Sequence, residues 1–252
     1  MDEYNGAAAA YSLRLLNSNY TGDAIVVRRD SDNATANIGF VGGELNTTYL
    51  NEFCNGANGF VAVWYDQSGN GLDAANGLAS GQPKIFDSVN GVVLENGKPA
   101  MTFNQYITLR SIFSSPIYPL TGFITFRGQV GRFIFDDNND VNTNSLFLLN
   151  STDIRFYNDS GKNIVHTISD SWNNQHLASF IADGTNSLLG IDSDFTTGTM
   201  GIDSLSGVTL GNIAAGTLGM NGTMQEAIIY PTNESSNRTG IETNINDFYN
   251  IY

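Results

Sequence analysis

Short apolar segments separated by glycine and asparagine recur along most of the chain. Between residues 59 and 230 they follow one another at intervals of roughly 8 to 14 residues, a spacing typical of antiparallel sheets and too short for alternating strands and helices. We therefore predict strands over Gly59–Tyr65, Gly91–Glu95, Ala100–Phe103, Gly122–Arg127, Arg132–Phe135, Ser145–Leu149, Ile154–Tyr157, His176–Ala182 and Thr223–Tyr230.

Helical patterns are confined to three segments. Alanine and leucine have high helix propensity, so "AAAAYSLRLL" (Ala7–Leu16) is predicted to form a short helix. A second helix is predicted over "LNTTYLNEFC" (Leu45–Cys54), with Asn46 or Thr47 as its N-cap and Cys54 buried on its apolar side. Near the C-terminus, one apolar stripe at helical spacing predicts a final helix; its members are Ile241, Ile245, Phe248 and Tyr249.

Composition supports an all-β protein with a substantial core. The 252 residues are 41% apolar and 11% aromatic but only 14% charged, a mixture expected where many short strands are joined by tight turns. We found no fixed-period repeat and no low-complexity linker, so we expect a single domain over residues 1–252. Pro116 and Pro119 indicate a rigid crossing loop within it.

Charge and motif content exclude several function classes. The net charge of -14 would repel a phosphate backbone, so nucleic acid is not expected as a partner. No apolar run is long enough to insert into a membrane, and the acidic start "MDEYNG" does not resemble an export signal. The single cysteine, Cys54, leaves no internal disulfide, which suits a reducing compartment. No phosphate loop, dinucleotide fingerprint or serine–histidine–acid set occurs, and we expect no cofactor.

Two regions of the sequence carry a resemblance to a known family. The stretch "AYSLRLLNSNYTGDAIVVRRDSDNATANIGF", followed by "GFVAVWYDQSGNGLDA", resembles the catalytic domain of the family 54 α-L-arabinofuranosidases. The segment "GVTLGNIAAGTLGMNGTMQEAIIY" is similar to the closing strands of the same fold. The resemblance implies a concanavalin-like jelly-roll β-sandwich of two antiparallel sheets with a few short helices, including one at the C-terminus.

The resemblance also implies where catalytic carboxyls would lie. A retaining glycosidase needs one carboxylate nucleophile and one acid/base carboxyl. Aligned with the family, the nucleophile position is occupied by Asn144 and the acid/base position by Ala215. An amide cannot act as that nucleophile and a methyl group carries no proton, so we expect no catalytic residue at these positions.

Candidate binding residues lie elsewhere in the chain. In "YDQSGNG", Asp66 and Asn70 are interpreted either as parts of a structural turn or as ligands for a sugar hydroxyl. Trp172, in a polar stretch, is expected to be partly exposed, either sealing the sandwich edge or stacking on a sugar.

Metal candidates are weaker. The oxygen-rich run "DDNNDVN" offers calcium ligands but lacks calcium-loop spacing, so a solvated hairpin tip is the simpler interpretation; its acids are Asp136, Asp137 and Asp140. His166 and His176 have no partner at metal spacing and are expected to be ordinary sheet histidines.

Three functional hypotheses follow. The first is a non-catalytic structural or adhesion module of a virus particle, such as a bacteriophage capsid decoration, head fibre or tail protein, because modules similar to this one occur there. It would be found in the virion and would contact other virion proteins, copies of itself or cell-surface glycans. The second is an active arabinofuranosidase that uses other carboxylates, such as Asp136, Asp140 or Asp203. The third is a lectin-like domain of a bacterial surface protein, with an extracellular or cell-surface location.

Overall fold

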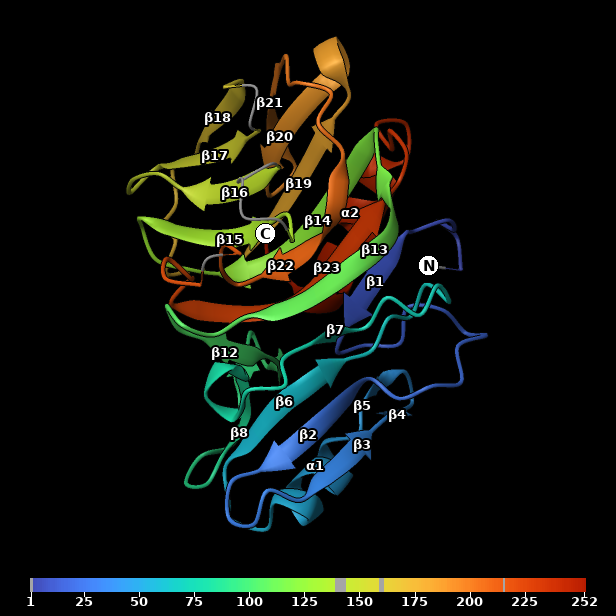
Figure 1. The fold of residues 1–252 in the computed structure, drawn as a ribbon, viewed down its shortest axis with the longest axis vertical. Coiled ribbons are helices and arrows are strands. Elements are labelled where there is room, and N and C mark those ends of the chain that lie inside the picture. The colour runs from blue at the N-terminus through green and yellow to red at the C-terminus, as the bar shows by residue number, and fades with distance from the viewer. Residues whose placement is uncertain (1, 139–143, 159–160, 215) are drawn as a thin grey trace.

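The apolar segments form an extended system of antiparallel strands, accompanied among the described residues by two α-helices and two single-turn 3-10 helices, Ala79–Gly81 and Gly184–Asn186 (Figure 1). The structure is a computed structural model that describes residues 2–138, 144–158, 161–214 and 216–252. The predicted all-β class, built as a sandwich of two antiparallel sheets with a C-terminal helix, is confirmed.

One layer of the sandwich, called the front sheet here, brings together strands from the middle of the chain. Its neighbours are paired antiparallel in the order β18–β17–β16–β15–β22–β13. Their bounds are β13 Leu109–Ile117, β15 Arg132–Asp136, β16 Ser145–Leu148, β17 Asp153–Tyr157, β18 Asn163–Thr167 and β22 Leu205–Leu210.

The other layer, the back sheet, has the long strand β23 near its centre. On one edge β23 pairs with β1 and β12, and on the other edge it pairs with β14, which continues through β19 and β20 to β21. These strands are β1 Ala9–Ser12, β12 Met101–Phe103, β14 Leu120–Arg127, β19 His176–Ala182, β20 Ser187–Ile191, β21 Asp194–Gly198 and β23 Gly222–Tyr230.

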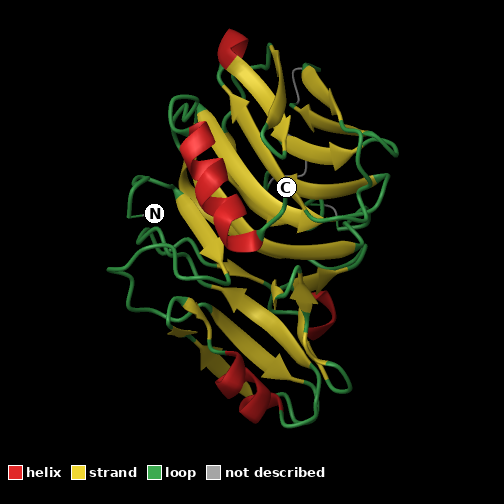
Figure 2. Cartoon of the chain, turned by 180° about the vertical axis from the view of Figure 1, so that it is seen from behind, coloured by secondary structure: helices red, strands yellow, loops and turns green. Residues whose placement is uncertain are grey.

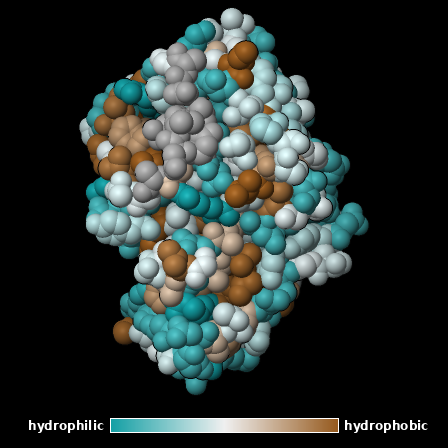
Figure 3. Space-filling model, viewed as in Figure 1, coloured by the Kyte–Doolittle hydropathy of each residue, from teal (hydrophilic) through white to brown (hydrophobic). Residues whose placement is uncertain are grey.

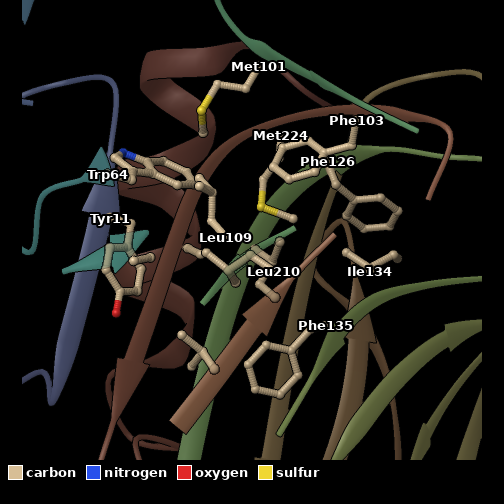
Figure 4. Packing of buried hydrophobic residues seen from close by; sticks show 14 of the residues in the cluster. Tyr11, Trp64, Met101, Phe103, Leu109, Phe126, Ile134, Phe135, Leu210 and Met224 are labelled. Atoms are coloured by element: carbon tan, nitrogen blue, oxygen red, sulfur yellow. The ribbon is translucent and has the colours of Figure 1, made fainter. Parts of the chain in front are cut away.

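The main core fills the space between the two sheets. Leu109 and Phe135 from the front sheet pack in one buried cluster with Phe126 and Met224 from the back sheet, as Figure 4 shows. Residues in a strand point alternately to its two sides, so the residue after each core position of the front sheet faces away from the core. That outer face is where the polar groups described below lie.

The outer face of the back sheet is covered by helix α2 (Arg238–Tyr249), which runs along the strands in Figure 2. Ile241, Ile245 and Tyr249 form a second apolar cluster with Phe123 and Ile228 of that sheet. The predicted C-terminal helix and its apolar stripe are confirmed.

The N-terminal strands form the lower part of Figure 1 and continue into both sheets. Strand β7 pairs with β13 and strand β8 pairs with β12, so hydrogen bonding runs from this part into the sandwich. The bounds are β2 Ile25–Arg29, β3 Thr35–Ile38, β6 Gly59–Trp64, β7 Ala74–Ala75, β8 Lys84–Asp87 and β9 Gly91–Val92. Two small ribbons complete it, β4 Phe40–Val41 with β5 Glu44–Leu45, and β10 Leu94–Glu95 with β11 Lys98–Pro99.

Helix α1 (Thr47–Cys54) packs beside these strands and confirms the second predicted helix. The side chain of Asn46 accepts a hydrogen bond from the Tyr49 backbone N–H at 3.0 Å, so Asn46 is the N-cap. Cys54 is buried in the core, as predicted, and burial raises the pKa of its thiol to about 11.

The first predicted helix is wrong, because residues 9–12 form strand β1. Ala9 and Tyr11 face the main core, whereas Ala10 lies in the cluster beneath α2. A strand buried on both faces gains more from packing and from pairing with β23 than alanine gains from its helix propensity. The small side chains at Ala7–Ala10 serve close packing rather than helix formation.

Candidate active site

A polar row crosses the outer face of the front sheet. Arg110 of β13 lies directly opposite Thr209 of β22, and Thr209 lies opposite Asp136 of β15. Paired residues point to the same face of a sheet, so these three side chains share the face away from the core. Ser145, at the start of β16, extends the row because its hydroxyl donates to Asp136 Oδ1 at 2.5 Å.

Asp136 is the central group of this row. Its side chain is completely buried, and Oδ2 accepts a hydrogen bond from the Ala214 backbone N–H at 3.2 Å. Loss of hydration disfavours the carboxylate and raises the pKa of Asp136 to about 6, although the hydrogen bonds from Ser145 and Ala214 act in the opposite direction. A carboxyl group with this pKa can give up or take a proton near neutral pH.

The carbonyl of Ala214 links Asp136 to the next charged side chain of the row. The guanidinium of Arg110 donates a hydrogen bond to the Ala214 carbonyl, and the N–H of the same residue donates to Asp136. Ala214 therefore links Arg110 to Asp136 through two hydrogen bonds of its backbone.

Asp137 has a different environment from its neighbour. Its Oδ1 accepts hydrogen bonds from the backbone N–H of Ser206 at 3.1 Å and from the Ser206 hydroxyl at 2.6 Å. The hydroxyl of Thr209 donates to the backbone carbonyl of Asp137 at 3.2 Å. These contacts fix the end of β15 against β22, which is a structural role.

Asn144, the residue at the predicted nucleophile position, is also buried. Its backbone has a positive φ of 58°, and its side-chain N–H donates to the carbonyl of Asp203 at 3.1 Å. Its side-chain oxygen has no hydrogen-bond partner among the residues that the structure describes. The backbone at Asp203 therefore lies beside Asn144, the residue that precedes Ser145.

The interpretation of Asp136–Asn142 as a solvated hairpin tip is wrong for its first two residues. Asp136 and Asp137 are both fully buried, because β22 and the Ala214 segment cover them. Asp140 and Ala215 lie outside the described residues. Within the described parts of the chain, no three histidine, cysteine or acidic side chains come together in a group that could hold a metal ion.

Asp66 is held by the turn that follows β6. Its Oδ1 accepts hydrogen bonds from the backbone N–H groups of Ala10 and Ser68, both at 2.9 Å. Its Oδ2 accepts from the Ser68 hydroxyl at 2.7 Å and from the Leu72 N–H at 3.1 Å. Both oxygens of this buried carboxylate therefore bind the protein itself.

Asn70 belongs to the same turn. Its side-chain N–H groups donate to the carbonyls of Ala7 and Ala8 at 3.1 and 3.0 Å, which anchors the residues leading into β1. Gly69 and Gly71 have φ values of 90° and 69°, a region that favours glycine. A structural role accounts for every one of these contacts.

Trp172 is not exposed, contrary to the expectation from its polar neighbours. It is 3% exposed, its ring stacks on Phe126 at a centroid distance of 6.3 Å, and its N–H donates to the Asn150 carbonyl. The polar residues around it face solvent while the indole turns into the core. No face of this ring is left for a sugar.

The two histidines lie in strands β18 and β19, as predicted. His176 is fully buried, with Nδ1 2.6 Å from Asp192 Oδ2 and Nε2 3.0 Å from the Ser171 carbonyl. His166 Nδ1 lies 3.1 Å from the Thr196 hydroxyl.

Arg110, Ser145 and Thr209 were not among the residues singled out from the sequence. The signal for them is the alternation within their strands, since each directly neighbours a core residue: Leu109, Leu146 and Leu210 respectively. The alternation of apolar and polar residues predicts which side chains of a strand point away from the core, but it does not predict which strands pair with each other.

The N-terminal half of the chain is related to known enzymes. Residues 4–126 match the family described as "Alpha-L-arabinofuranosidase B, catalytic". Alpha-L-arabinofuranosidase B of Penicillium canescens is 31% identical over 118 residues, which are 46% of this chain and 25% of that protein. A probable alpha-L-arabinofuranosidase B of Aspergillus terreus is 42% identical over 103 residues, 37% of this chain and 20% of that protein.

Solved structures extend the comparison to nearly the whole chain. A mutant GH54 α-L-arabinofuranosidase soaked with 4-nitrophenyl α-L-arabinofuranoside superposes with a TM-score of 0.72 and 17% identity, covering 94% of this chain and 62% of that one. The protein has the GH54 α-L-arabinofuranosidase catalytic fold. An arabinofuranosidase complexed with arabinofuranosyl-α-1,2-xylobiose gives a TM-score of 0.67 with the same two coverages. The GH54 relatives are thus longer than this chain.

These relatives correct the first functional hypothesis. The prediction of a non-catalytic module of a virus particle is wrong, because the family match, the curated relatives and the superposed GH54 structures are all arabinofuranosidases. The prediction that the protein is not an enzyme is overturned by the same findings. The assignment of Asn144 and Ala215 to the two family positions stays a prediction.

Proposed function

We propose that the protein is a glycoside hydrolase that removes α-L-arabinofuranosyl groups from a larger carbohydrate. Its GH54 fold and the family match of residues 4–126 support this substrate class. The observation that carries the proposal is Asp136, a carboxyl group whose pKa is raised to about 6 by burial beneath the Ala214 segment, on the face of the front sheet that points away from the main core.

Asp136 would act as the general acid. Its proton passes to the glycosidic oxygen as the bond from that oxygen to the anomeric carbon of arabinose breaks. Water supplies the hydroxyl group that the released arabinose gains at this carbon, and its remaining proton restores the acid. The Ala214 N–H donates to Asp136 Oδ2 at 3.2 Å, so the Ala214 segment lies over the carboxyl group that the substrate oxygen must reach.

The second carboxylate would come from outside the two predicted family positions. Asp203 is the described candidate, because its backbone carbonyl accepts a hydrogen bond from the side chain of Asn144, which directly precedes Ser145 in the chain, and so brings this part of the backbone near the polar row. Asp140, which lies outside the described residues, remains the other one.

Release of 4-nitrophenol from 4-nitrophenyl α-L-arabinofuranoside tests the proposal. We expect turnover of this substrate and none of 4-nitrophenyl β-D-xylopyranoside, which has a different sugar ring and anomeric configuration. A purified, folded protein that releases no 4-nitrophenol from the arabinofuranoside between pH 4 and pH 8 would refute it.

We propose an extracellular or cell-surface location with a carbohydrate partner, in keeping with hydrolysis of polymeric glycans. The net charge of -14 argues against nucleic acid as a partner. Among the described residues, no helix has the length and apolar character needed to cross a membrane. The concanavalin-like name for the sandwich stays a prediction.

A further inference from the structure

An aromatic pair lies on the outer face of the front sheet. Phe133 of β15 is directly opposite Phe147 of β16, and their ring centroids are 4.6 Å apart. Leu146 and Leu148, on either side of Phe147, belong to the main core, so alternation turns Phe147 and its partner Phe133 away from that core. Both phenylalanines are partly exposed to solvent.

Two further apolar side chains extend this pair into a patch. Val165 of β18 is 36% exposed and Leu218 is 42% exposed, and the Leu218 carbonyl accepts a hydrogen bond from the Phe133 backbone N–H at 3.0 Å. Figure 3 shows hydrophobic residues gathered at the left of the molecule, where Figure 1 places β15, β16 and β17. Exposed apolar side chains that gather in one place mark a binding surface, whereas scattered ones do not.

One cation lies within this apolar patch. Arg155 of β17 is directly opposite Phe147 on one side and Val165 on the other, so its side chain shares their face of the sheet. Within the described parts of the chain, its guanidinium has neither a hydrogen-bond partner nor an ion pair. Nε is sealed from solvent, but the side chain as a whole is partly exposed, so the terminal N–H groups are the ones that a ligand can reach.

A shortage of carboxylates does not explain the unpaired guanidinium. Acidic residues outnumber Lys and Arg by 25 to 11, and six other cations form ion pairs with them: Arg14, Arg29, Lys84, Lys98, Arg127 and Arg238. Apolar neighbours weaken the hydration of Arg155, and a poorly hydrated guanidinium attracts an anion more strongly than a fully hydrated one does. The patch therefore has a place for a negatively charged group of a ligand.

The apolar members of the patch indicate what the rest of that ligand is. Side chains of Phe, Val and Leu offer no hydrogen bonds to sugar hydroxyls, which disfavours a sugar acid. An aromatic ring can pack against Phe133 and Phe147 in an offset or edge-on arrangement. Opposed residues of paired strands lie about 5 Å apart, so a carboxylate on or close to the same ring reaches the Arg155 guanidinium.

We propose that Phe133, Phe147 and Arg155 form a binding site for an aromatic carboxylate. The ring packs on the two phenylalanines, and the carboxylate accepts hydrogen bonds from the terminal N–H groups of Arg155. This site goes beyond the proposed hydrolysis, because it requires no turnover and uses neither Asp136 nor Ser145.

Calorimetric titration with 4-hydroxycinnamate and with its neutral amide tests the site. We expect the wild type to bind the carboxylate about 10-fold more tightly than the amide. Arg155→Met, which keeps an unbranched side chain without the charge, should bind the two compounds equally. Phe147→Ala should weaken the binding of both compounds by about 10-fold, because the ring loses its packing surface.

Phe195→Ala is the matched control. Phe195 is 45% exposed and its ring centroid lies 4.3 Å from the guanidinium carbon of Arg238, but Arg238 is already paired with Glu242 at 2.7 Å. This variant should bind 4-hydroxycinnamate as the wild type does. The proposal is overturned if the wild type does not bind 4-hydroxycinnamate, binds the amide equally well or binds glucuronate more tightly. Equal losses in Phe147→Ala and Phe195→Ala would overturn it as well.

The titration separates this site from the proposed function, because binding is measured without catalysis. A folded protein that binds 4-hydroxycinnamate but releases no 4-nitrophenol from the arabinofuranoside supports the site and refutes the hydrolase. Hydrolysis without binding of 4-hydroxycinnamate overturns the site alone.

Discussion

The hydroxyl of Ser145 donates to Oδ1 of Asp136 at 2.5 Å, so the hydroxyl of one strand stabilises the carboxylate of its neighbour. This hydrogen bond lowers the pKa of Asp136 against the larger, opposing effect of burial. Ser145→Ala should therefore raise that pKa further. If protonated Asp136 is the active form, the fall of kcat/KM at alkaline pH should move to higher pH in this variant, as measured in a pH series on the aryl arabinofuranoside.

Ser206→Ala is the matched control for that series, because Ser206 donates to Asp137 and not to Asp136. In Ser206→Ala, the fall of kcat/KM at alkaline pH should occur at the same pH as in the wild type. If kcat/KM of Ser145→Ala falls at the same alkaline pH as in the wild type, or if this pH moves equally in both variants, Asp136 does not set the pH dependence of kcat/KM.

The contact between buried His176 and partly exposed Asp192 makes stability depend on pH. Both ring nitrogens of His176 face oxygen acceptors, Asp192 and the Ser171 carbonyl. Burial acts to lower the pKa of His176, but the hydrogen bond and charge of Asp192 outweigh it and the pKa is raised. The stabilisation is fully present below the unfolded value of about 6.5 and is lost as pH rises through the higher folded value.

Urea unfolding at pH 6 and at pH 8.5 checks this prediction. The free energy of unfolding should decrease more in the wild type than in His176→Gln over this range. His166→Gln gives the contrast. Burial lowers the pKa of His166, so the contribution of this histidine to the free energy of unfolding increases, rather than decreases, as pH rises. An identical decrease in the wild type and in His176→Gln would contradict the assignment.

A buried ion pair ties the chain termini together. Arg14 donates to both carboxylate oxygens of Glu226, at 2.8 and 3.0 Å, and the hydroxyls of Ser12 and Tyr249 donate to the same carboxylate. Glu226→Gln leaves the Arg14 charge buried without its partner and should lower the free energy of unfolding by about 3 kcal/mol. The exposed pair of Arg29 and Asp32 is the control, and Asp32→Asn should change stability little. Comparable losses in the two variants in urea titrations would contradict this view of the buried pair.

The turn at Asp66 can be tested in the same way. Its carboxylate accepts four hydrogen bonds from Ala10, Ser68 and Leu72, and the amide of Asp66→Asn would place N–H groups against N–H donors. We expect a loss of about 2 kcal/mol in the free energy of unfolding with no change in KM for 4-nitrophenyl α-L-arabinofuranoside. A raised KM in a variant of unchanged stability would instead make Asp66 a sugar ligand.

The sequence pattern predicted the individual strands and helices of this fold better than it predicted which of them lie side by side. The strand His176–Ala182 and the stripe of Ile241 and Ile245 are confirmed because alternation and helical spacing are properties of one short segment. The alanines of β1 were misread because their burial on both faces depends on β23, more than 200 residues away. Trp172 was misread because its polar neighbours conceal a side chain that turns inward onto Phe126.

The candidate site was the least predictable part. Asp136 was visible as an acid at the end of a strand, but its burial depends on β16, β22 and the Ala214 segment. The pairing of strands from different parts of the chain sets that environment, and sequence alternation leaves the pairing open.

The most direct test of the account is the turnover of 4-nitrophenyl α-L-arabinofuranoside by the wild type and by Asp136→Asn at pH 5. Asparagine has nearly the same shape but carries no acidic proton, and both proteins should remain folded by circular dichroism. We predict that kcat falls by about 100-fold or more in Asp136→Asn. Equal turnover by the two proteins would contradict the role of Asp136, and the absence of turnover in the folded wild type would contradict the hydrolase itself.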